Sequence, residues 1–351
     1  MTYFSVFSGI EATSVAWQGL GYEPVGFSEI DPFCCAVLAH RFPAVTNYGD
    51  IKKYKEWKIE KTVDIVVGGS PCQSYSIAGD RQGSKVESGR LMFTYGNFVN
   101  YMRPRWLVWE NVDGVLSSNK GRDFEEFLSM LDEYGYGLAW RIFDAQYFGV
   151  PQRRRRVFVI GYLGDVRRPT AVLIDTQGGG GNTAPRKKEG GGASRRTGKN
   201  AEATVYNVHQ HDSRIKKSDG LIDAVTRLWG TGGNNTPLCL ADQIVFNRAT
   251  ISKYKADVRA ATLLGDHHDK GLVSLVPDAA DGLLRRIMPV EAERLQGFPD
   301  NWTKVPYKKK SADVCPDGPR YTAIGNSMAV PVMGWLGARI ALVEAIFGEV
   351  A

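Results

Sequence analysis

The chain has 351 residues, of which 43% are hydrophobic, and this length suits one large α/β domain plus a smaller one. No run reaches the roughly 18 uninterrupted apolar residues of a membrane helix, and the N-terminus lacks the regions of a secretion signal, so we expect a cytoplasmic protein without a membrane partner. The net charge of +6 is compatible with a polyanionic partner, while five cysteines without a CxxC spacing argue against a disulfide framework or a zinc site.

Residues 1–166 alternate strand-like and helix-like segments, which predicts an α/β domain with a doubly wound, mostly parallel sheet. The apolar runs VDIVV and RWLVW are typical of strands buried in such a sheet. In chain order we expect strands at 3–8, 24–31, 63–70, 105–112, 140–145 and 156–164, and helices at 11–21, 32–42 and 121–135.

The character of the sequence changes after about Arg167. Residues 177–200 are rich in glycine and basic residues and are expected to form a flexible loop. Short β-like runs follow, and helical patterns return at 289–298 and 331–348. We therefore expect a smaller β-rich domain at 167–284, inserted before a segment, 285–351, that returns to the first domain.

Three positions near strand ends are candidates for binding a nucleotide-like ligand. Gly9 lies at a strand-to-helix turn, where backbone N–H groups are free, although these residues alone favour a plain tight turn. Glu29 ends the second strand and could accept hydrogen bonds from ribose hydroxyls, or be an exposed loop acid. Asp50 follows a third expected strand, and the alternative there is an ordinary turn acid.

Cys72 lies in the segment GGSPCQ, directly after the buried run VDIVV, where open α/β sheets place their ligands. A free thiol has a pKa near roughly 8.5, so a nucleophilic cysteine needs positive charge beside it. The alternative is a small buried hydrophobic residue.

An acid and a run of arginines supply charge further along the chain. Glu110, in WENV, stands among Trp, Leu and Val and should have a raised pKa, which suits a group that holds a proton at neutral pH. In the run QRRRRVF, alternate residues of a strand share a face, so Arg154 and Arg156 should point one way and Arg153 and Arg155 the other.

The motifs FSGI, GGSPCQS, ENV, QRRRRVF, AERLQGFP and YTAIGNSMAVP, in this order, resemble the C5-cytosine-specific DNA methyltransferase family. The resemblance covers nearly the whole chain except about residues 167–284. It implies a Rossmann-like fold and an enzyme that transfers a methyl group from S-adenosyl-L-methionine to carbon 5 of cytosine in a specific duplex DNA sequence. The family extrudes the target base from the duplex.

The resemblance also implies roles for single residues. Cys72 would attack carbon 6 of the base, and Glu110 would hydrogen-bond N3 and the exocyclic amine. Arg154 and Arg156 would hold the base O2 and lower the pKa of Cys72. The residues implied in cofactor binding are Phe7, Gly9, Ile10, Glu29, Asp50, Ile51, Pro71, Asn326 and Ser327.

Residues 74–90 resemble the mobile loop that closes over the flipped base, and 167–284 would be the target recognition domain. The DNA contacts implied are Gln73, Ser76, Arg81, Lys85, Arg90 and Thr262. The chain departs from the family pattern at Glu11 and Ala12, where paired glycines are usual, at 90–93, which follow the pattern only loosely, and at Met288, where a capping threonine is common.

The sequence leaves the recognition site open, and also whether a separate restriction endonuclease accompanies the enzyme. We expect a monomer and no metal. The alternatives are an RNA cytosine methyltransferase of the same fold, a catalytically inactive DNA-binding protein, and a dinucleotide oxidoreductase, which the missing GxGxxG makes improbable.

Overall fold

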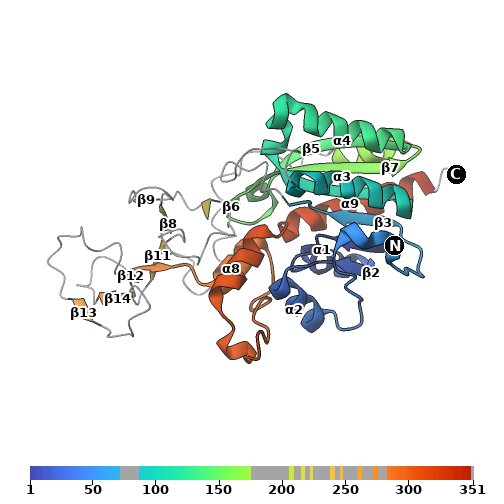
Figure 1. The fold of residues 1–351 in the computed structure, drawn as a ribbon. Coiled ribbons are helices and arrows are strands. Elements are labelled where there is room, and N and C mark those ends of the chain that lie inside the picture. Colours follow the sequence, from blue (N-terminus) through green and yellow to red (C-terminus); the bar gives the residue numbers. More distant parts are fainter. Residues whose placement is uncertain are drawn as a thin grey trace.

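A computed structural model describes residues 1–71, 87–174 and 287–348, and the backbone of eight short strands between residues 205 and 286. A six-stranded sheet of order β2-β1-β3-β4-β7-β5 forms the centre of the large domain (Figure 1). Its strands are β1 (Thr2–Val6), β2 (Glu23–Ser28), β3 (Ile65–Gly68), β4 (Trp106–Val112), β5 (Tyr136–Asp144) and β7 (Arg155–Leu163).

The first four strands of this sheet are parallel, and β7 runs antiparallel to both of its neighbours, β4 and β5. The expectation of a mostly parallel α/β sheet is confirmed. The expectation of a third strand before Asp50 is wrong. That stretch contributes an isolated bridge between Phe27 and Asn47, and the backbone then enters a short 3₁₀ helix, η2 (Ile51–Glu56).

Helices cover both faces of the sheet. One face carries α1 (Ala12–Trp17), α5 (Arg167–Leu173) and α9 (Val330–Gly348), whose apolar side chains share a core with Trp106 and Ile160. The other face carries η2, α3 (Glu87–Met102) and α4 (Arg122–Glu133), which enclose Trp109 and Val159. The helix α3 was not among the sequence expectations. The other 3₁₀ helices described are η1 (Gln18–Leu20), η4 (Asp113–Gly121), η5 (Ala145–Phe148) and η7 (Ala312–Val314).

A third apolar cluster joins the two ends of the chain. It lies between α2 (Pro32–Arg41), α7 (Pro289–Gln296) and α8 (Asp317–Asn326) and includes Ile10, Leu295 and Ile324. The indole of Trp302 donates a hydrogen bond of 2.8 Å to the Ile10 carbonyl. The segment that follows the insertion therefore packs directly on the loop after β1.

The inserted region contains short strands, drawn apart from the large domain in Figure 1. A four-stranded sheet has the order β15-β11-β8-β9, a three-stranded sheet has the order β12-β14-β13, and β10 pairs with β6. The bounds are β6 (Gln152–Arg153), β8 (Val205–Val208), β9 (Ile215–Lys217), β10 (Ile222–Asp223), β11 (Leu238–Ala241), β12 (Phe246–Asn247), β13 (Ala260–Thr262), β14 (Leu272–Leu275) and β15 (Leu283–Arg286). The domain division stays a prediction, with α5, just beyond residue 166, packed in the core of the large domain.

One helical stretch in the described part of the chain, Asp317–Gly348, is long and apolar enough by composition to cross a membrane. A core helix meets the same criterion. On α9, Met333, Leu336 and Ile340 are fully buried against the sheet, and 33% of the apolar window is buried in all.

Two glycines of α9 give a matched test of this packing. A Cβ at position 337 would lie 2.4 Å from Nε1 of Trp17, which is itself buried and donates to the Met333 carbonyl, whereas a Cβ at position 334 would meet no atom within 4 Å. We expect Gly337→Ala to lower the free energy of unfolding by about 1–3 kcal/mol. We expect Gly334→Ala to raise it by about 0.5–1 kcal/mol. Urea unfolding measures both, and equal stabilisation by the two changes would contradict this packing.

Candidate active site

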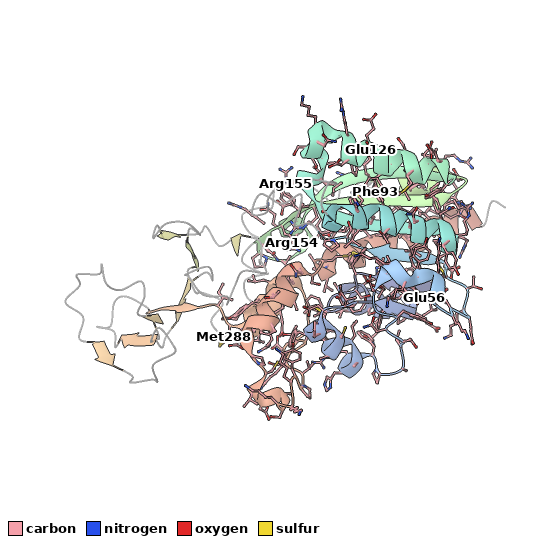
Figure 2. The ribbon with its side chains drawn as sticks, in the orientation of Figure 1. Glu56, Phe93, Glu126, Arg154, Arg155 and Met288 are labelled. Carbon is pink, nitrogen blue, oxygen red and sulfur yellow. The ribbon has the colours of Figure 1, made fainter. Side chains whose placement is uncertain are left out.

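The candidate site lies at the carboxyl ends of β1 to β4, the edge at which open α/β sheets bind their ligands. Glu29 follows β2 directly, Gly69 follows β3, and Glu110 lies two residues before the end of β4. The antiparallel strand β7 begins at this same edge. Figure 2 places Arg154 and Arg155 there, at the end of the sheet nearer the inserted strands.

Glu110 and Arg156 form an ion pair at the end of β4. Their side chains approach to 3.3 Å between Oε1 and Nε, and they are only 11% and 18% exposed. Burial raises the pKa of the Glu110 carboxyl above its ordinary value, and the positive charges of Arg156 and Arg154 oppose that rise. The expected direction of this pKa shift is therefore confirmed.

The strand register explains why these two residues meet. In the antiparallel β4–β7 pair, Val112 stands opposite Arg156 and Glu110 stands opposite Phe158. Glu110 and Val112 share a face of β4, so Arg156 is the diagonal neighbour of Glu110 on that face. A parallel β7 would bring the start of the strand, and Arg156 with it, to the opposite edge of the sheet.

The loop after β3 is fixed against β4 by polar contacts. The Asn111 amide donates to the carbonyl of Ser70 at 3.2 Å and to its hydroxyl at 3.1 Å, and the Trp109 indole also donates to that hydroxyl at 3.2 Å. A Cβ on Gly69 would lie 2.9 Å from Oε2 of Glu110, so a side chain here would displace the Glu110 carboxyl. These contacts hold the backbone that leads to Pro71, one residue before Cys72.

Arg154 lies on the same side of the run of arginines as Arg156. Arg154 is 3% exposed and Arg156 is partly buried, whereas Arg153 and Arg155 are exposed. Arg155 forms a surface ion pair with Asp113, 3.3 Å between Nε and Oδ2. The predicted alternation of the four arginines is confirmed.

The Arg154 guanidinium binds backbone carbonyls at the end of α8. Its Nη1 and Nη2 each donate to the Gly325 carbonyl at 3.2 Å, and Nη2 donates to the Ser327 carbonyl at 2.6 Å. The Arg154 backbone N–H donates to the Asp144 carboxylate at 2.9 Å. Arg154 thus joins the start of β7 to the turn between α8 and α9.

Glu29 organises the loop after β1. Its Oε2 accepts the Gly9 N–H at 2.7 Å, and its Oε1 accepts the N–H groups of Ile30 and Asp31, both at 2.7 Å. Burial raises the pKa of Glu29, although these three N–H donors favour the charged form. The carboxylate therefore fixes the turn of Gly9 relative to the end of β2.

These residues fit an adenosyl cofactor. Gly9 has a φ of +56°, and a Cβ on it would meet no atom within 4 Å, so the space beside its backbone is open among the described residues. A partly buried acid beside an open glycine turn is the pairing that ribose hydroxyls and a closely approaching ligand require. The fit rests on Gly9 and Glu29 together.

The sequence of this chain also matches a known protein family. Residues 1–341 match the family described as C-5 cytosine-specific DNA methylase. The chain belongs to this family. Its six-stranded sheet, with one antiparallel strand, is the methyltransferase core that the sequence motifs predicted.

Several known relatives are similar in sequence. A protein of Escherichia phage P1 named DNA N-6-adenine-methyltransferase is 32% identical over 97% of this chain and 61% of its own length. The orphan methyltransferase M.SPRI of Bacillus phage SPR is 38% identical over 46% of this chain and 38% of its own length. The type II methyltransferase M.Sau3AI of Staphylococcus aureus is 28% identical over 86% of this chain and 83% of its own length. The chain thus spans less than two thirds of the length of the two phage relatives.

Solved structures of similar fold include the Dnmt2 methyltransferase of S. pombe, with a TM-score of 0.62 and 18% identity over 99% of both chains. A putative DNA modification methyltransferase from an E. coli prophage has a TM-score of 0.59 and 18% identity, covering 98% of this chain and 99% of its own. At these identities the likeness supports the methyltransferase fold and does not indicate a substrate.

The remaining predicted cofactor residues of this methylase family member lie around the same edge. Asp50 accepts the Lys52 N–H at 3.0 Å and caps η2, while Ile51 and Ile10 are buried. Phe7 has a left-handed φ of 52°. Asn326, at the end of α8, is exposed, and Ser327 is 7% exposed. Their roles as ligand contacts stay predictions.

Several predicted residues of the methylase site lie outside the described residues or on elements of which only the backbone is described. Thr262 ends β13, and Arg90 is an exposed residue of α3. Those outside the described residues are Cys72, Gln73, Ser76, Arg81, Lys85 and the loop 177–200.

Sequence reasoning missed the polar residues that join the start of β7 to α7 and α8. The Gln152 amide donates to the Leu295 carbonyl at 2.8 Å and to the Gln296 side chain at 3.2 Å, and Gln296 donates to the Ile324 carbonyl at 2.9 Å. Both glutamines belong to sequence motifs, QRRRRVF and AERLQGFP. No pattern in the sequence indicated that their side-chain amides bind backbone carbonyls. Ser70 belongs to the motif GGSPCQS, whereas Trp302 lies in none of the motifs.

The departures from the family pattern at Glu11 and Met288 have a structural explanation. Glu11 has a φ of 62°, the left-handed conformation that glycine favours, and its carboxylate accepts the Ser14 N–H at 3.1 Å and the Ser14 hydroxyl at 2.5 Å. The side chain therefore caps α1 and offsets the strain at this position. At Met288 the side chain makes no capping hydrogen bond, and Glu291 accepts the Met288 N–H at 2.7 Å instead.

The buried Glu11 carboxyl predicts a pH dependence of stability. Burial raises its pKa from 4.5 to about 7, with the neighbouring Glu29 charge adding to the rise. Between these values the unfolded chain is ionised here and the folded chain keeps its proton. This group's contribution to the free energy of unfolding, about 3 kcal/mol, is therefore present at low pH and is lost as pH rises to about 7.

Urea unfolding at pH 5 and pH 7.5 checks this expectation with the Glu11→Gln variant. Stability relative to wild type should improve by about 2–3 kcal/mol from the lower to the higher pH, because the amide does not titrate. Glu23→Gln, at an exposed position of β2, is the control for loss of a carboxylate. An unchanged difference between wild type and Glu11→Gln at the two pH values would contradict the assignment.

Proposed function

We propose that the chain transfers a methyl group from S-adenosyl-L-methionine to carbon 5 of cytosine in duplex DNA, with Cys72 as the nucleophile. The observation that carries the proposal is the buried Glu110–Arg156 pair, held by Asn111 and Ser70 against the backbone that leads to Cys72. Family membership supplies the reaction class. The positive charge that a reactive thiol needs would be supplied by Arg154 and Arg156.

In this mechanism the Cys72 thiolate forms a bond to carbon 6 of a cytosine that has been extruded from the duplex. Carbon 5 becomes nucleophilic and accepts the methyl group that S-adenosyl-L-methionine supplies when bound. Loss of the carbon 5 proton then breaks the bond between sulfur and carbon 6. The covalent step is required because an aromatic pyrimidine carbon is otherwise a poor nucleophile.

Glu110 recognises the base and holds a proton. Burial raises the pKa of the Glu110 carboxyl, which eases uptake of a proton during the reaction. Once protonated, the carboxyl would donate to N3, while its second oxygen would accept from the exocyclic amine. Thymine has no such amine, so the same contact discriminates against it. Arg156, on the same face, would donate to O2 and stabilise the negative charge that develops on the ring.

The cofactor is assigned to the loop after β1 and the neighbouring strand ends. Glu29 would accept the ribose hydroxyls, Phe7 would lie against the adenine ring, and Asp50 would accept the adenine amine. Gly9 allows the close approach of the backbone that this arrangement needs. Asn326 and Ser327 would close the site from the returning segment.

The partner proposed is double-stranded DNA, read by the inserted strands, in a cytoplasmic setting. The type II relatives favour a role in restriction–modification, and the phage relative M.SPRI, named an orphan methyltransferase, favours a role without an endonuclease. Both are compatible with the same chemistry at Cys72.

A second candidate function is methylation of the adenine N6 amine, because the relative from phage P1 carries that name. An exocyclic amine is itself a nucleophile and needs no covalent attack by a cysteine. The Gly69-Ser70-Pro71 approach to Cys72 and the cationic strand beside it therefore favour cytosine.

The deciding experiment incubates the protein with duplex DNA and methyl-labelled cofactor and identifies the labelled nucleoside. We expect 5-methylcytosine, with activity lowered by more than about 10³-fold in Cys72→Ser. DNA that contains 5-fluorocytosine should trap wild type covalently, because the fluorine cannot leave as a proton does. Labelled N6-methyladenine, or full turnover by Cys72→Ser, would overturn the proposal, and duplex RNA and tRNA are the substrate controls.

Replacement of the base-recognition acid gives an independent test. Glu110→Gln should lower the rate of methyl transfer by about 10²–10³-fold, because the amide cannot supply the proton to N3. Glu126→Gln, on the surface of α4, should transfer methyl groups at the wild-type rate (Figure 2). A Glu110→Gln enzyme with wild-type single-turnover rate would remove Glu110 from the mechanism.

A further inference from the structure

The returning segment of the chain is fastened to β7 by a buried set of polar side chains. Arg154 donates to the carbonyls of Gly325 and Ser327, and Gln296 donates to the Ile324 carbonyl at 2.9 Å. Gln152 links Gln296 to the start of β7. Arg154, Gln152 and Gln296 are all almost fully buried.

These polar side chains join parts of the chain that lie on either side of the inserted region. Arg154 precedes the inserted region and Gly325 follows it, 171 residues further along the chain. The Ile324 and Gly325 carbonyls belong to the last turn of α8, which carries the negative end of the helix dipole, and the Ser327 carbonyl follows at the C-cap. A guanidinium there favours one conformation of the turn that presents Asn326 and Ser327.

We infer that Arg154 is a positioning residue for the cofactor, acting through the Gly325–Ser327 turn, while Arg156 alone acts on the base. This division of labour rests on the proposed function, since it assumes that Asn326 and Ser327 face the cofactor. It follows from where the two guanidinium groups are held: Arg156 lies 3.3 Å from the Glu110 carboxylate, and Arg154 lies 2.6 Å from a backbone carbonyl of the turn.

The geometry of the guanidinium is what this role requires. Two carbonyls two residues apart converge on one planar fork, and a lysine ammonium cannot reproduce that arrangement even though it keeps the charge. Arg154→Lys should therefore loosen the turn and keep the positive potential near Cys72. Arg156→Lys should have the opposite effect, because the turn is untouched and the contact with the base is changed.

The experiment measures cofactor affinity and turnover separately in these two variants. By calorimetric titration with S-adenosyl-L-homocysteine, we expect Arg154→Lys to raise Kd at least about tenfold, with kcat at saturating cofactor within about threefold of wild type. We expect Arg156→Lys to keep Kd within about twofold and to lower kcat about a hundredfold. Arg155→Ala, on the exposed side of the same strand, is the control and should match wild type in both measurements.

The opposite pattern overturns the inference: wild-type affinity with a large loss of kcat in Arg154→Lys would make Arg154 a residue that contacts the base. If Arg154→Lys fails to fold, Gln296→Met is the second variant, because it removes the bond to the Ile324 carbonyl and keeps the side-chain volume. A Gln296→Met protein with wild-type Kd would also overturn it. Wild-type protein that binds no cofactor would instead contradict the proposed function.

Discussion

Burial of the Glu110 carboxyl at the end of β4 is the constraint on which the rest of the site depends. A carboxyl removed from water loses solvation, and its ionised form is retained only beside positive charge. Arg156 supplies that charge because β7 runs antiparallel to β4 and starts where β4 ends. The reversed strand in an otherwise parallel sheet is therefore what places a cation beside the acid.

The return of the chain after the inserted region depends on a different kind of interaction. The strands between residues 205 and 286 separate the two parts of the large domain by a long stretch of sequence. Apolar packing of Ile10, Leu295 and Ile324 brings the parts together without specifying a register. The directional bonds of Arg154, Gln152 and Gln296 then fix where the turn after α8 lies.

The loop after β1 contains Glu11 at a position where the family usually has glycine. A glutamate with a left-handed backbone would ordinarily be strained, and Glu11 compensates by capping α1 through Ser14. The cost appears as a buried acid with a raised pKa, close to the Glu29 carboxylate that fixes Gly9. The backbone strain at Glu11, the capping of α1 and the charge of Glu29 therefore depend on one another within one short loop next to the proposed cofactor site.

The sequence by itself determined the alternation of strands and helices, the order of the motifs, and the outward and inward faces of the four arginines, because periodicity and strand geometry are local properties. It also determined the direction of the Glu110 pKa shift, since neighbouring Trp, Leu and Val predict burial. Tertiary structure decided that Asp50 follows a bridge and not a strand, and that α3 is a helix. It alone decided that Arg154 reaches Gly325 and that Glu110 reaches Arg156, because both contacts depend on the register between segments far apart in the chain, which no local pattern encodes.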